Sequence, residues 1–402
     1  MTKQTETSLD RAQGPTTLRP PPVFKPDRSL GGLSSDTTRA NQTAVAPVRV
    51  ARNMLPAVCD VSVTNVCNAA CDFCGFARDK SLVGPRRYID LEAFTRAMPV
   101  LHRNRFRYMT FQGGEPLVHP QIVTLVERAT KAGIRCGLIT NGWFLARSID
   151  SLVRAGLRRL SISIDSDDIE RHEANRGLAG LGVRIKQSIG MAHKRGLRVW
   201  ASVTVSRLVD YDRLPSTLAR LGFDAVSFSY PRRQAFGSTS LVYDEHSALI
   251  DMSGEELLAA LESIAGMRKK FRVLVPANSL AEVTRFVRGE KQRIPCVGGK
   301  KYFYIDWNLN IWRCEAWPEP MGSVLDFDRI RDAEKPCYAC MMGCYRHTSA
   351  MMHGPIALTD AVQSLLRGNV AASIAALSRK GIGYSLRTLL EQKFLGSEFM
   401  VQ

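Results

Sequence analysis

The chain has 402 residues, of which 45% are hydrophobic and 23% are charged, an ordinary composition for a globular enzyme. At about 150 residues per domain, this length allows two or three domains. No run of about 18 uncharged apolar residues occurs, and the N-terminus has no apolar signal region, which argues against a membrane span and against secretion. We therefore expect a cytoplasmic protein.

Charge and cysteine content narrow the possible chemistry. Lys and Arg number 55 against 38 Asp and Glu, which gives a net charge of +17. This charge favours anionic partners such as nucleic acid, phosphorylated metabolites or an acidic membrane surface, although a generally basic proteome would also explain it. Disulfides are uncommon in the cytosol, so the ten cysteines indicate metal or redox chemistry.

The sequence changes character near residue 48, so residues 1–48 and residues 49–235 are considered as separate segments. Residues 1–48 are polar and rich in Pro and Gly, which predicts a disordered tail. From residue 58, β-rich runs alternate with stretches of helical periodicity. The expected strands are 58–67, 106–116, 134–142, 157–166, 197–206 and 223–230, and the expected helices are 91–103, 120–133, 146–156, 183–196 and 212–222.

This alternation predicts an α/β fold with a parallel sheet. Four of the five helical stretches end on Gly, the usual helix stop. Six strands are too few for a closed eight-stranded barrel, so residues 49–235 are expected to form a partial (β/α)6 barrel.

Three further segments follow the barrel. Residues 236–290 are expected to be a linker with one helix, near 255–270. Residues 291–346 hold five cysteines and few long elements, which predicts a small domain stabilised by something other than a large core. Residues 347–402 are expected to form a C-terminal helical extension interrupted at RG and KG.

The first cysteine group follows the first predicted strand. Cys67, Cys71 and Cys74 are spaced as C-x3-C-x2-C. Three thiolates on one loop can ligate three irons of a [4Fe–4S] cubane and leave the fourth iron for a substrate or cosubstrate. A structural zinc site needs four ligands, and no fourth Cys or His lies near these three, since Cys59 is inside the strand.

The motifs around this loop resemble those of the radical S-adenosylmethionine (radical SAM) superfamily. Phe73 stands at the aromatic position of its cysteine motif, and GGEP at 113–116 matches its GGE motif. TNG at 140–142, the S-x-D of 163–165 and the RG of 176–177 follow in the family's order. All of these except the downstream RG lie at predicted carboxyl ends of strands, where barrels carry their chemistry.

The resemblance implies a set of cofactor-binding residues. Glu115 would accept hydrogen bonds from the methionine ammonium of S-adenosylmethionine, and Arg176 would bind its carboxylate. The implied set is Phe73, Gly113, Gly114, Glu115, Asn141, Ser163, Asp165 and Arg176.

The second cysteine group is similar to the SPASM or twitch auxiliary-cluster extensions of the same superfamily. It consists of Cys296, Cys314, Cys337, Cys340 and Cys344, and residues 296–314 resemble the family's ligand-bearing hairpin. The sequence departs from the full SPASM pattern in two ways. Leu309 stands where a Gly is usual, and the cysteines are too few for two auxiliary clusters. We expect one auxiliary [4Fe–4S] cluster on the first four, with Cys344 a substitute ligand or a free thiol. A four-thiolate zinc site is the alternative.

The resemblance implies an enzyme that cleaves S-adenosylmethionine reductively to a 5′-deoxyadenosyl radical and abstracts hydrogen from its substrate. One auxiliary cluster suits oxidation, so an oxidoreductase or a carbon-bond-forming enzyme is expected, reduced by a donor such as flavodoxin or ferredoxin. We expect a small-molecule or lipid substrate. The alternatives are a SPASM-type peptide maturase or, outside enzymes, a zinc- or cluster-binding nucleic-acid scaffold, although no specific nucleic-acid motif is present.

Two basic regions have weaker implications. Residues 78–107 hold eight basic and three acidic residues, either a rim for an anionic partner or a solvated helix face. The C-terminal helical extension is apolar-periodic and basic, which suits packing on the barrel or an anionic membrane. We expect packing, with weak peripheral membrane contact as the alternative.

Overall fold

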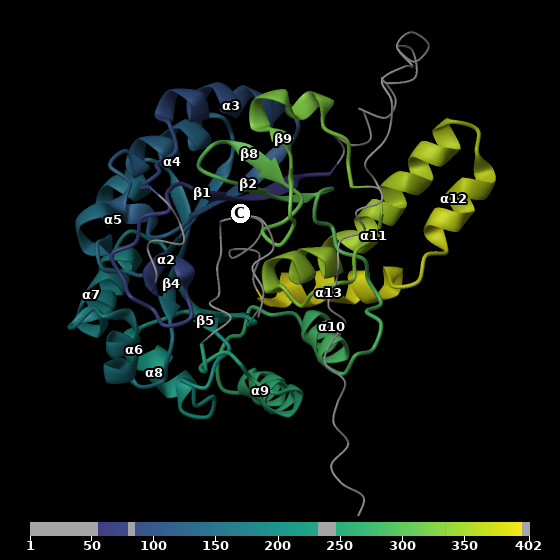
Figure 1. Cartoon of the computed structure of the whole chain (residues 1–402). Helices are drawn as coiled ribbons and strands as arrows, with labels where there is room; N and C mark the ends of the chain where they lie inside the picture. Colours follow the sequence, from purple (N-terminus) through teal and green to yellow (C-terminus); the bar gives the residue numbers. More distant parts are fainter. Residues whose placement is uncertain (1–54, 79–84, 232–246, 334, 396–402) are drawn as a thin grey trace, which may run out of the picture.

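The computed structural model describes residues 55–78, 85–231, 247–333 and 335–395 (Figure 1). The predicted tail of residues 1–48 lies outside this part, as do residues 79–84 of the basic 78–107 segment. The described chain forms a nine-stranded sheet of order β6-β5-β4-β3-β2-β1-β7-β8-β9. Its first six strands are parallel, as predicted: β1 (Ala57–Ser62), β2 (Phe106–Gln112), β3 (Arg135–Thr140), β4 (Leu157–Ile164), β5 (Val199–Thr204) and β6 (Ala225–Ser229).

Helices connect these parallel strands, and the sheet is not closed into a barrel. The helices are α2 (Gly75–Arg78), α3 (Leu91–Arg103), α4 (Ile122–Lys131), α5 (Leu145–Arg154), α6 (Ile169–Arg176), α7 (Leu181–His193) and α8 (Leu214–Leu221). The Gly residues predicted to end helices, at 133, 156, 196 and 222, all have positive φ values. The mixed α/β fold with a partial barrel is confirmed.

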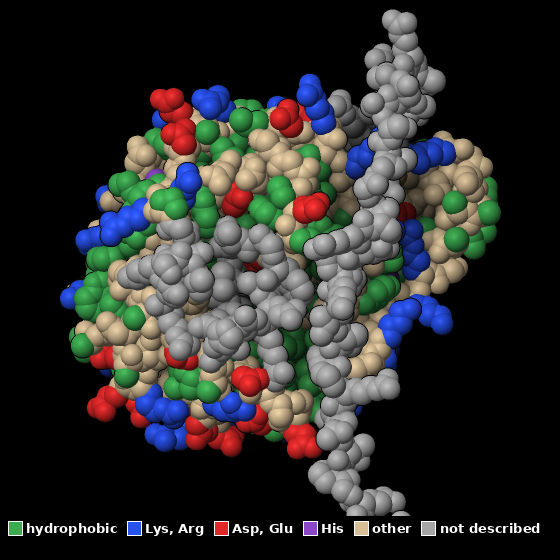
Figure 2. Space-filling model, viewed as in Figure 1, with side chains coloured by type: hydrophobic (Ala, Val, Ile, Leu, Met, Phe, Trp, Pro, Cys, Tyr) green, Lys and Arg blue, Asp and Glu red, His purple; other side chains and the backbone are tan. Residues whose placement is uncertain are grey.

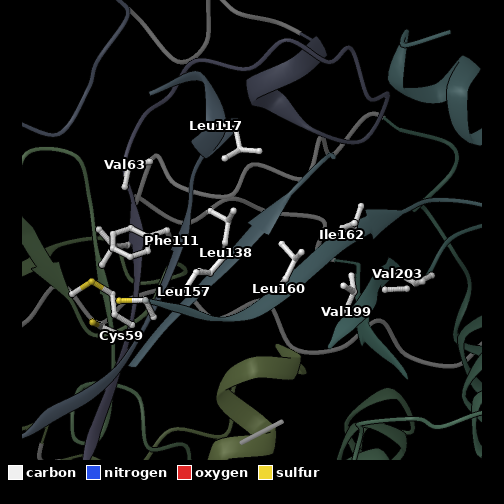
Figure 3. Packing of buried hydrophobic residues seen from close by; sticks show 14 of the residues in the cluster. Cys59, Val63, Phe111, Leu117, Leu138, Leu157, Leu160, Ile162, Val199 and Val203 are labelled. Atoms are coloured by element: carbon white, nitrogen blue, oxygen red, sulfur yellow. The ribbon is translucent and has the colours of Figure 1, made fainter. Parts of the chain in front are cut away.

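The two faces of the sheet differ in polarity because successive side chains of a strand point to opposite sides. One face carries Phe111, Leu138, Leu160 and other apolar side chains of a single buried cluster, together with the helices packed against it (Figure 3). The alternate positions carry polar side chains, namely Asp60, Ser62, Thr110, Gln112, Arg159, Ser161 and Ser163. A polar face inside a partial barrel provides space for polar ligands rather than a dry core.

Three further strands extend the sheet beyond β1. They are β7 (Tyr302–Ile305), β8 (Asn310–Trp312) and β9 (Pro320–Ser323), followed by the 3-10 helix η3 (Val324–Arg329). β7 pairs parallel with β1 and antiparallel with β8, so the hairpin lies where the sequence places it. Leu309, which occupies the position of the usual Gly, has φ of 60°, the left-handed conformation that glycine adopts without strain. Its buried side chain joins the main apolar cluster.

The segment after the barrel contains more helix than predicted. The expected helix is present as α9 (Gly254–Met267), and a second helix, α10 (Ala277–Val287), follows it. The prediction of one helix in residues 236–290 is therefore incomplete. Leu280 and Val283 of α10 are buried three residues apart, a spacing too short in so brief a segment to identify a helix from sequence.

The C-terminal helices begin inside the open side of the partial barrel. They are α11 (Gly343–Leu366), α12 (Val370–Leu377) and α13 (Ile382–Leu395), separated at Gly368 and Gly381 as predicted. A Cβ on Gly343 would stand 3.0 Å from the carbonyl oxygen of Phe228 at β6. The ring of Tyr345 lies 4.4 Å from that of Tyr302 on β7. The first turn of α11 thus contacts both β6 and β7.

A buried ion pair fixes α11 to α10. Arg346 Nη2 lies 3.1 Å from Glu282 Oε2, and both side chains are about 1% exposed. The same carboxylate accepts the backbone N–H of Arg293, and Arg346 also donates to the carbonyl of Ile294. Charged groups so deeply buried are strongly destabilising when one partner is lost.

We therefore expect Glu282→Ala to destabilise the protein by about 3–5 kcal/mol, because it leaves the Arg346 guanidinium buried without its counter-ion. Urea or thermal unfolding measures this. Arg103→Ala is the matched control, since Arg103 pairs with Asp328 with half of its side chain exposed, and should cost less than about 1 kcal/mol. Equal shifts in the two variants would contradict the assignment.

Candidate active site

The first cysteine group lies on the loop that follows β1, at the carboxyl ends of the parallel strands. Cys67, Cys71 and Cys74 are free thiols that interact electrostatically with one another. Burial raises the pKa of each thiol to about 12. Metal ligation would require their deprotonation, so the binding of iron here would release protons.

Two glycines bring the end of β2 against this loop. A Cβ on Gly113 would stand 2.4 Å from the carbonyl oxygen of Thr64, and one on Gly114 would stand 2.3 Å from that of Val66. The backbone N–H of Gly114 donates to Thr64, and that of Glu115 donates to Val66, both at 2.8 Å. The glycines are therefore required for backbone contact with the segment directly before Cys67, whatever they do toward a ligand.

Glu115 joins β2 to β3 through its buried carboxylate. Oε1 accepts from the Thr140 hydroxyl at 2.6 Å and from the backbone N–H of Leu117 at 3.0 Å. Oε2 accepts from the backbone N–H of Asn141 at 2.7 Å. These three donors use three of about four acceptor positions of a carboxylate. Burial raises its pKa, while these hydrogen bonds favour the charged form.

The end of β3 contacts the cysteine loop through a pair of amides. Asn141 Nδ2 donates to Asn68 Oδ1 at 2.9 Å, and Asn141 Oδ1 accepts from the backbone N–H of Trp143. Asn68 lies directly after Cys67 in the sequence. The TNG motif thereby positions the cysteine loop, an arrangement in which Asn68 was not anticipated from the sequence.

The end of α6 holds the other half of the loop. The carbonyl of Arg176 accepts the backbone N–H of Ala70, and Asn175 Oδ1 accepts that of Asp72. Asp165, beyond β4, accepts from Arg176 Nη2 at 2.6 Å and from Asn175 Nδ2 at 2.8 Å. Burial alone would raise the pKa of Asp165, but the Arg176 guanidinium holds it well below its usual range. Asp165 and Arg176 are thus brought together as an ion pair.

His172, which lies on the same helix as Arg176, completes this arrangement. It is buried, and its Nδ1 accepts the backbone N–H of Asp165 at 3.2 Å. Burial lowers its pKa, and the Asp165 carboxylate opposes this effect. The i, i+4 spacing of His172 and Arg176 on α6 was the available signal, because it places both on one helix face.

Two buried donors near the loop have no partner among the described residues. They are Asn68 Nδ2 and Arg176 Nε. Unpaired buried donors are costly and suit a ligand with acceptor groups, such as the carboxylate of an amino acid. Phe73 packs with Leu208 and Ile250 beside Cys74, and Ser163 lies on the polar face of β4. The donor set therefore fits S-adenosylmethionine next to a three-thiolate cluster.

A polar cluster on the inner face of the sheet was not anticipated from the sequence. Tyr302 donates to Asp60 Oδ2 at 2.8 Å, and Gln112 Nε2 donates to Glu315 Oε1 at 2.8 Å. Burial raises the pKa of Asp60 to about 6, against the opposing effect of Tyr302. The signal was the alternation of Asp60 and Ser62 with apolar residues in the first strand.

The second cysteine group lies around the first turn of α11. The backbone N–H of Cys296 donates to the carbonyl of Cys337 at 2.8 Å, and the thiol of Cys296 interacts electrostatically with those of Cys337 and Cys340. Burial raises its pKa to about 11, and Arg346 opposes this. Arg346 Nε and Nη1 have no partner among the described residues. Buried donors beside thiols suit an anionic cluster, whose sulfurs accept hydrogen bonds.

The remaining two thiols, like those of Cys296 and Cys340, pack against the small apolar cluster that contains Tyr302 and Tyr345. Cys314 and Cys344 both interact with Tyr345, and Cys344 also lies beside Glu315, Asp60 and Tyr302. Burial, followed by the two carboxylates, raises the pKa of Cys344. Cys344 therefore faces the inner polar cluster, in contrast to Cys296.

No three His, Cys, Asp or Glu side chains in the described part of the chain converge closely enough to hold a single metal ion. A mononuclear zinc site would need four ligands around one point, whereas each thiolate of a cubane binds a different iron.

Comparison with known proteins gives a family match over the barrel. Residues 61–226 match the model of the radical SAM superfamily. The chain is 39% identical over 116 residues to GTP 3′,8-cyclase of Heliobacterium modesticaldum, which covers 28% of this chain and 36% of that protein. It is 30% identical over 166 residues to AdoMet-dependent heme synthase of Methanosarcina barkeri, which covers 39% and 45%. The chain thus matches a third to a half of the length of these curated relatives.

The fold is also similar to a solved structure, that of polyhistidine-tagged anSMEcpe with bound AdoMet. The TM-score is 0.51 at 14% sequence identity, over 85% of this chain and 97% of that one. At this identity the likeness concerns the fold alone. Together with the motifs at the strand ends, the family match identifies residues 61–226 as a radical SAM domain.

Proposed function

We propose that the chain is an enzyme that binds a [4Fe–4S] cluster through Cys67, Cys71 and Cys74 and cleaves S-adenosylmethionine reductively, in order to abstract hydrogen from a small-molecule or lipid substrate. The cluster and S-adenosylmethionine supply the electron and the 5′-deoxyadenosyl radical. The observation that carries this proposal is the hydrogen-bonded attachment of the cysteine loop to the ends of β2, β3 and α6.

The roles of the surrounding residues follow from their contacts. Glu115 retains about one acceptor position for an ammonium group, and Arg176 retains a buried N–H for a carboxylate. Asp165 orients the Arg176 guanidinium. Phe73, packed with Leu208 and Ile250, excludes water from one side of Cys74. These residues bind and orient the cosubstrate.

The inner face of the partial barrel is the proposed substrate space. Ser62, Arg159 and Ser161 have buried polar atoms without partners among the described residues, which supports a substrate with polar groups. Asp60, with a pKa of about 6, would exchange a proton near neutral pH. The relatives are named for reactions that involve GTP and heme, which supports a small molecule over a peptide.

An auxiliary [4Fe–4S] cluster on Cys296, Cys314, Cys337 and Cys340 is the second part of the proposal. The contacts of Cys296 with Cys337 and Cys340, and the unpaired donors of Arg346, support it. Such a cluster beside the inner polar face suits acceptance of a substrate electron, with flavodoxin or ferredoxin as the external donor. A peptide maturase and a zinc scaffold are the alternatives that experiments must separate from it.

Anaerobic reconstitution with iron and sulfide tests the proposal. We expect about eight irons per chain from two four-iron clusters, and 5′-deoxyadenosine on reduction with S-adenosylmethionine. Replacement of Cys67, Cys71 and Cys74 by Ala should remove about half the iron and all 5′-deoxyadenosine. Cys59→Ala and Cys136→Ala, at buried thiols on strands, are the controls. Full iron in the triple variant, or zinc in the native protein, would contradict the proposal.

Glu115→Ala should weaken S-adenosylmethionine binding by about ten- to a hundred-fold, because loss of a charged hydrogen bond costs about 1.5–3 kcal/mol. Equilibrium dialysis on reconstituted protein measures this. Glu115→Gln, which retains the side-chain shape and one acceptor oxygen for Thr140 and Leu117 but loses the charge, separates the two roles of the side chain. We expect the Gln variant to be as stable as the unaltered protein but still to bind S-adenosylmethionine weakly. An unchanged dissociation constant in the Ala variant would refute the assignment.

Single substitutions identify the auxiliary ligands. Cys337→Ser should remove about half of the iron, whereas Cys344→Ser should retain it, because Cys337 adjoins Cys296 while Cys344 faces Asp60 and Glu315. Iron analysis and electron paramagnetic resonance of the reduced proteins give the result. The reverse pattern would assign Cys344 as the fourth ligand.

A further inference from the structure

The C-terminal helices expose most of the large apolar side chains found on the described surface. Nine of the twelve exposed large hydrophobic residues belong to α11, α12 and α13. Leu366 is 82% exposed, Ile374 60% and Val370 56%. Large apolar side chains gathered on the exposed sides of neighbouring helices mark a site of contact with another molecule or with a membrane.

The pattern in these helices is the inverse of that in a water-exposed helix. On α12, Val370, Ile374 and Leu377 point outward at i, i+4 and i+7, while Ser373 and Ala376 are buried. Helix α12 carries no charged residue at all.

Helix α13 shows the same inversion. Leu386 and Leu390 are more than half exposed, whereas Ser385 and Thr388 are fully buried. Both helices therefore place small or hydroxyl-bearing residues inward and large apolar residues outward.

Small residues make the contacts between these helices. A Cβ on Gly354 of α11 would stand 3.2 Å from Ser385 Oγ, and that hydroxyl accepts the backbone N–H of Gly354 at 2.9 Å. Ala357 and Ala361 are buried on the same helix. Packing through small residues, with large apolar side chains outside, is typical of helices in a lipid environment.

A basic groove adjoins the apolar surface. It has a volume of about 970 Å³ and six basic lining residues, Arg285, Lys291, Arg293, Arg379, Lys380 and Arg387. Arg285 pairs with Glu290, and Arg379 pairs with Asp360. Within the described part of the chain, the other four have no acidic side chain within ion-pair distance.

The groove and the apolar surface are continuous along the chain. Arg379 and Lys380 follow directly after α12, and Arg387 lies between Leu386 and Leu390 on α13. Figure 2 shows hydrophobic side chains on the outer end of the protruding α11–α12 lobe, with Lys and Arg side chains close to it. The combination suits an amphiphilic partner with an anionic polar part.

We propose that the end of α11, α12 and α13 form a contact surface for anionic membranes, on which the outward apolar residues enter the bilayer interface and the basic groove binds lipid phosphates. No helix in the described residues is long and apolar enough to cross a membrane, so the helices would lie in the plane of the interface. A second copy of the chain is disfavoured as the occupant, because it would bring another uncompensated basic groove against this one. The membrane contact is independent of the radical chemistry, but on the proposed function it favours a lipid-borne substrate.

Sedimentation of the full-length reconstituted protein with vesicles tests this surface. We expect binding to vesicles of phosphatidylcholine with phosphatidylglycerol and little binding to phosphatidylcholine alone. Binding should weaken as salt rises, since exposed charges are screened over about 10 Å at 0.1 M. Absence of binding to the anionic vesicles would overturn the proposal.

Two variants separate the apolar and basic contributions. The triple variant Val370→Ser, Ile374→Ser and Leu377→Ser, and the double variant Lys380→Glu and Arg387→Glu, should each reduce vesicle binding at least about ten-fold. Both should still form 5′-deoxyadenosine, because all five positions lie outside the proposed cofactor site.

Matched controls lie on the opposite part of the fold. The apolar control is Val183→Ser, at an exposed residue of α7, and the basic control is the double variant Lys186→Glu and Lys194→Glu. Both should bind anionic vesicles as the unaltered protein does. Equal losses in the controls would show non-specific attraction to a basic protein. A full-length dimer that the triple Ser variant converts to a monomer, without vesicle binding by either, would assign the surface to a second copy instead.

Discussion

The site depends on the contact between two stretches of backbone, at Gly113–Gly114 and at residues 64–66. A Cβ atom on either glycine would stand only 2.3–2.4 Å from a carbonyl oxygen of residues 64–66, so no side chain fits between the two stretches. The contact fixes the loop that begins at Cys67 to the end of β2, and Glu115 then joins that end to β3 through Thr140 and Asn141. One steric constraint therefore holds three thiols and the carboxylate together before any cofactor is present. Pre-organised sites avoid the cost of ordering at the moment of binding.

The first turn of α11 links the second cysteine group to the barrel interior. It contacts β6 through Gly343 and β7 through Tyr345, so it occupies the side that a closed barrel would seal with further strands. The residues on this turn belong to three environments: Cys344 adjoins Asp60, Tyr345 adjoins Cys314, and Arg346 adjoins Cys296. An auxiliary cluster placed here would lie beside the proposed substrate space, which is the position required for electron exchange with a bound substrate.

Local patterns predicted the elements, whereas long-range contacts determined the site. Six strands and their order followed from periodicity and from glycine stops, because both are encoded within about 15 residues. The requirement for glycine at positions 113 and 114 could not be predicted in this way, because the backbone that excludes a Cβ there lies about 50 residues earlier in the chain. Leu309 was noted as a departure from a glycine, and the structure retains the left-handed turn there. The Asp60–Tyr302 pair joins residues 242 positions apart, and no pattern in one sequence predicts it.

The C-terminal helices show how a correct periodicity can lead to an incomplete interpretation. Apolar spacing predicted helices that pack, and they do pack, through Gly354, Ser385 and other small residues. The same spacing was assumed to mark the buried face, yet Val370 and Ile374 point outward. Periodicity identifies an apolar stripe but does not say whether protein or lipid covers it. Ser373 and Ala376 are buried while the larger Val370 and Ile374 are exposed, and this pattern supports the proposed membrane contact, because a helix stabilised only by water exclusion would bury its largest apolar side chains first.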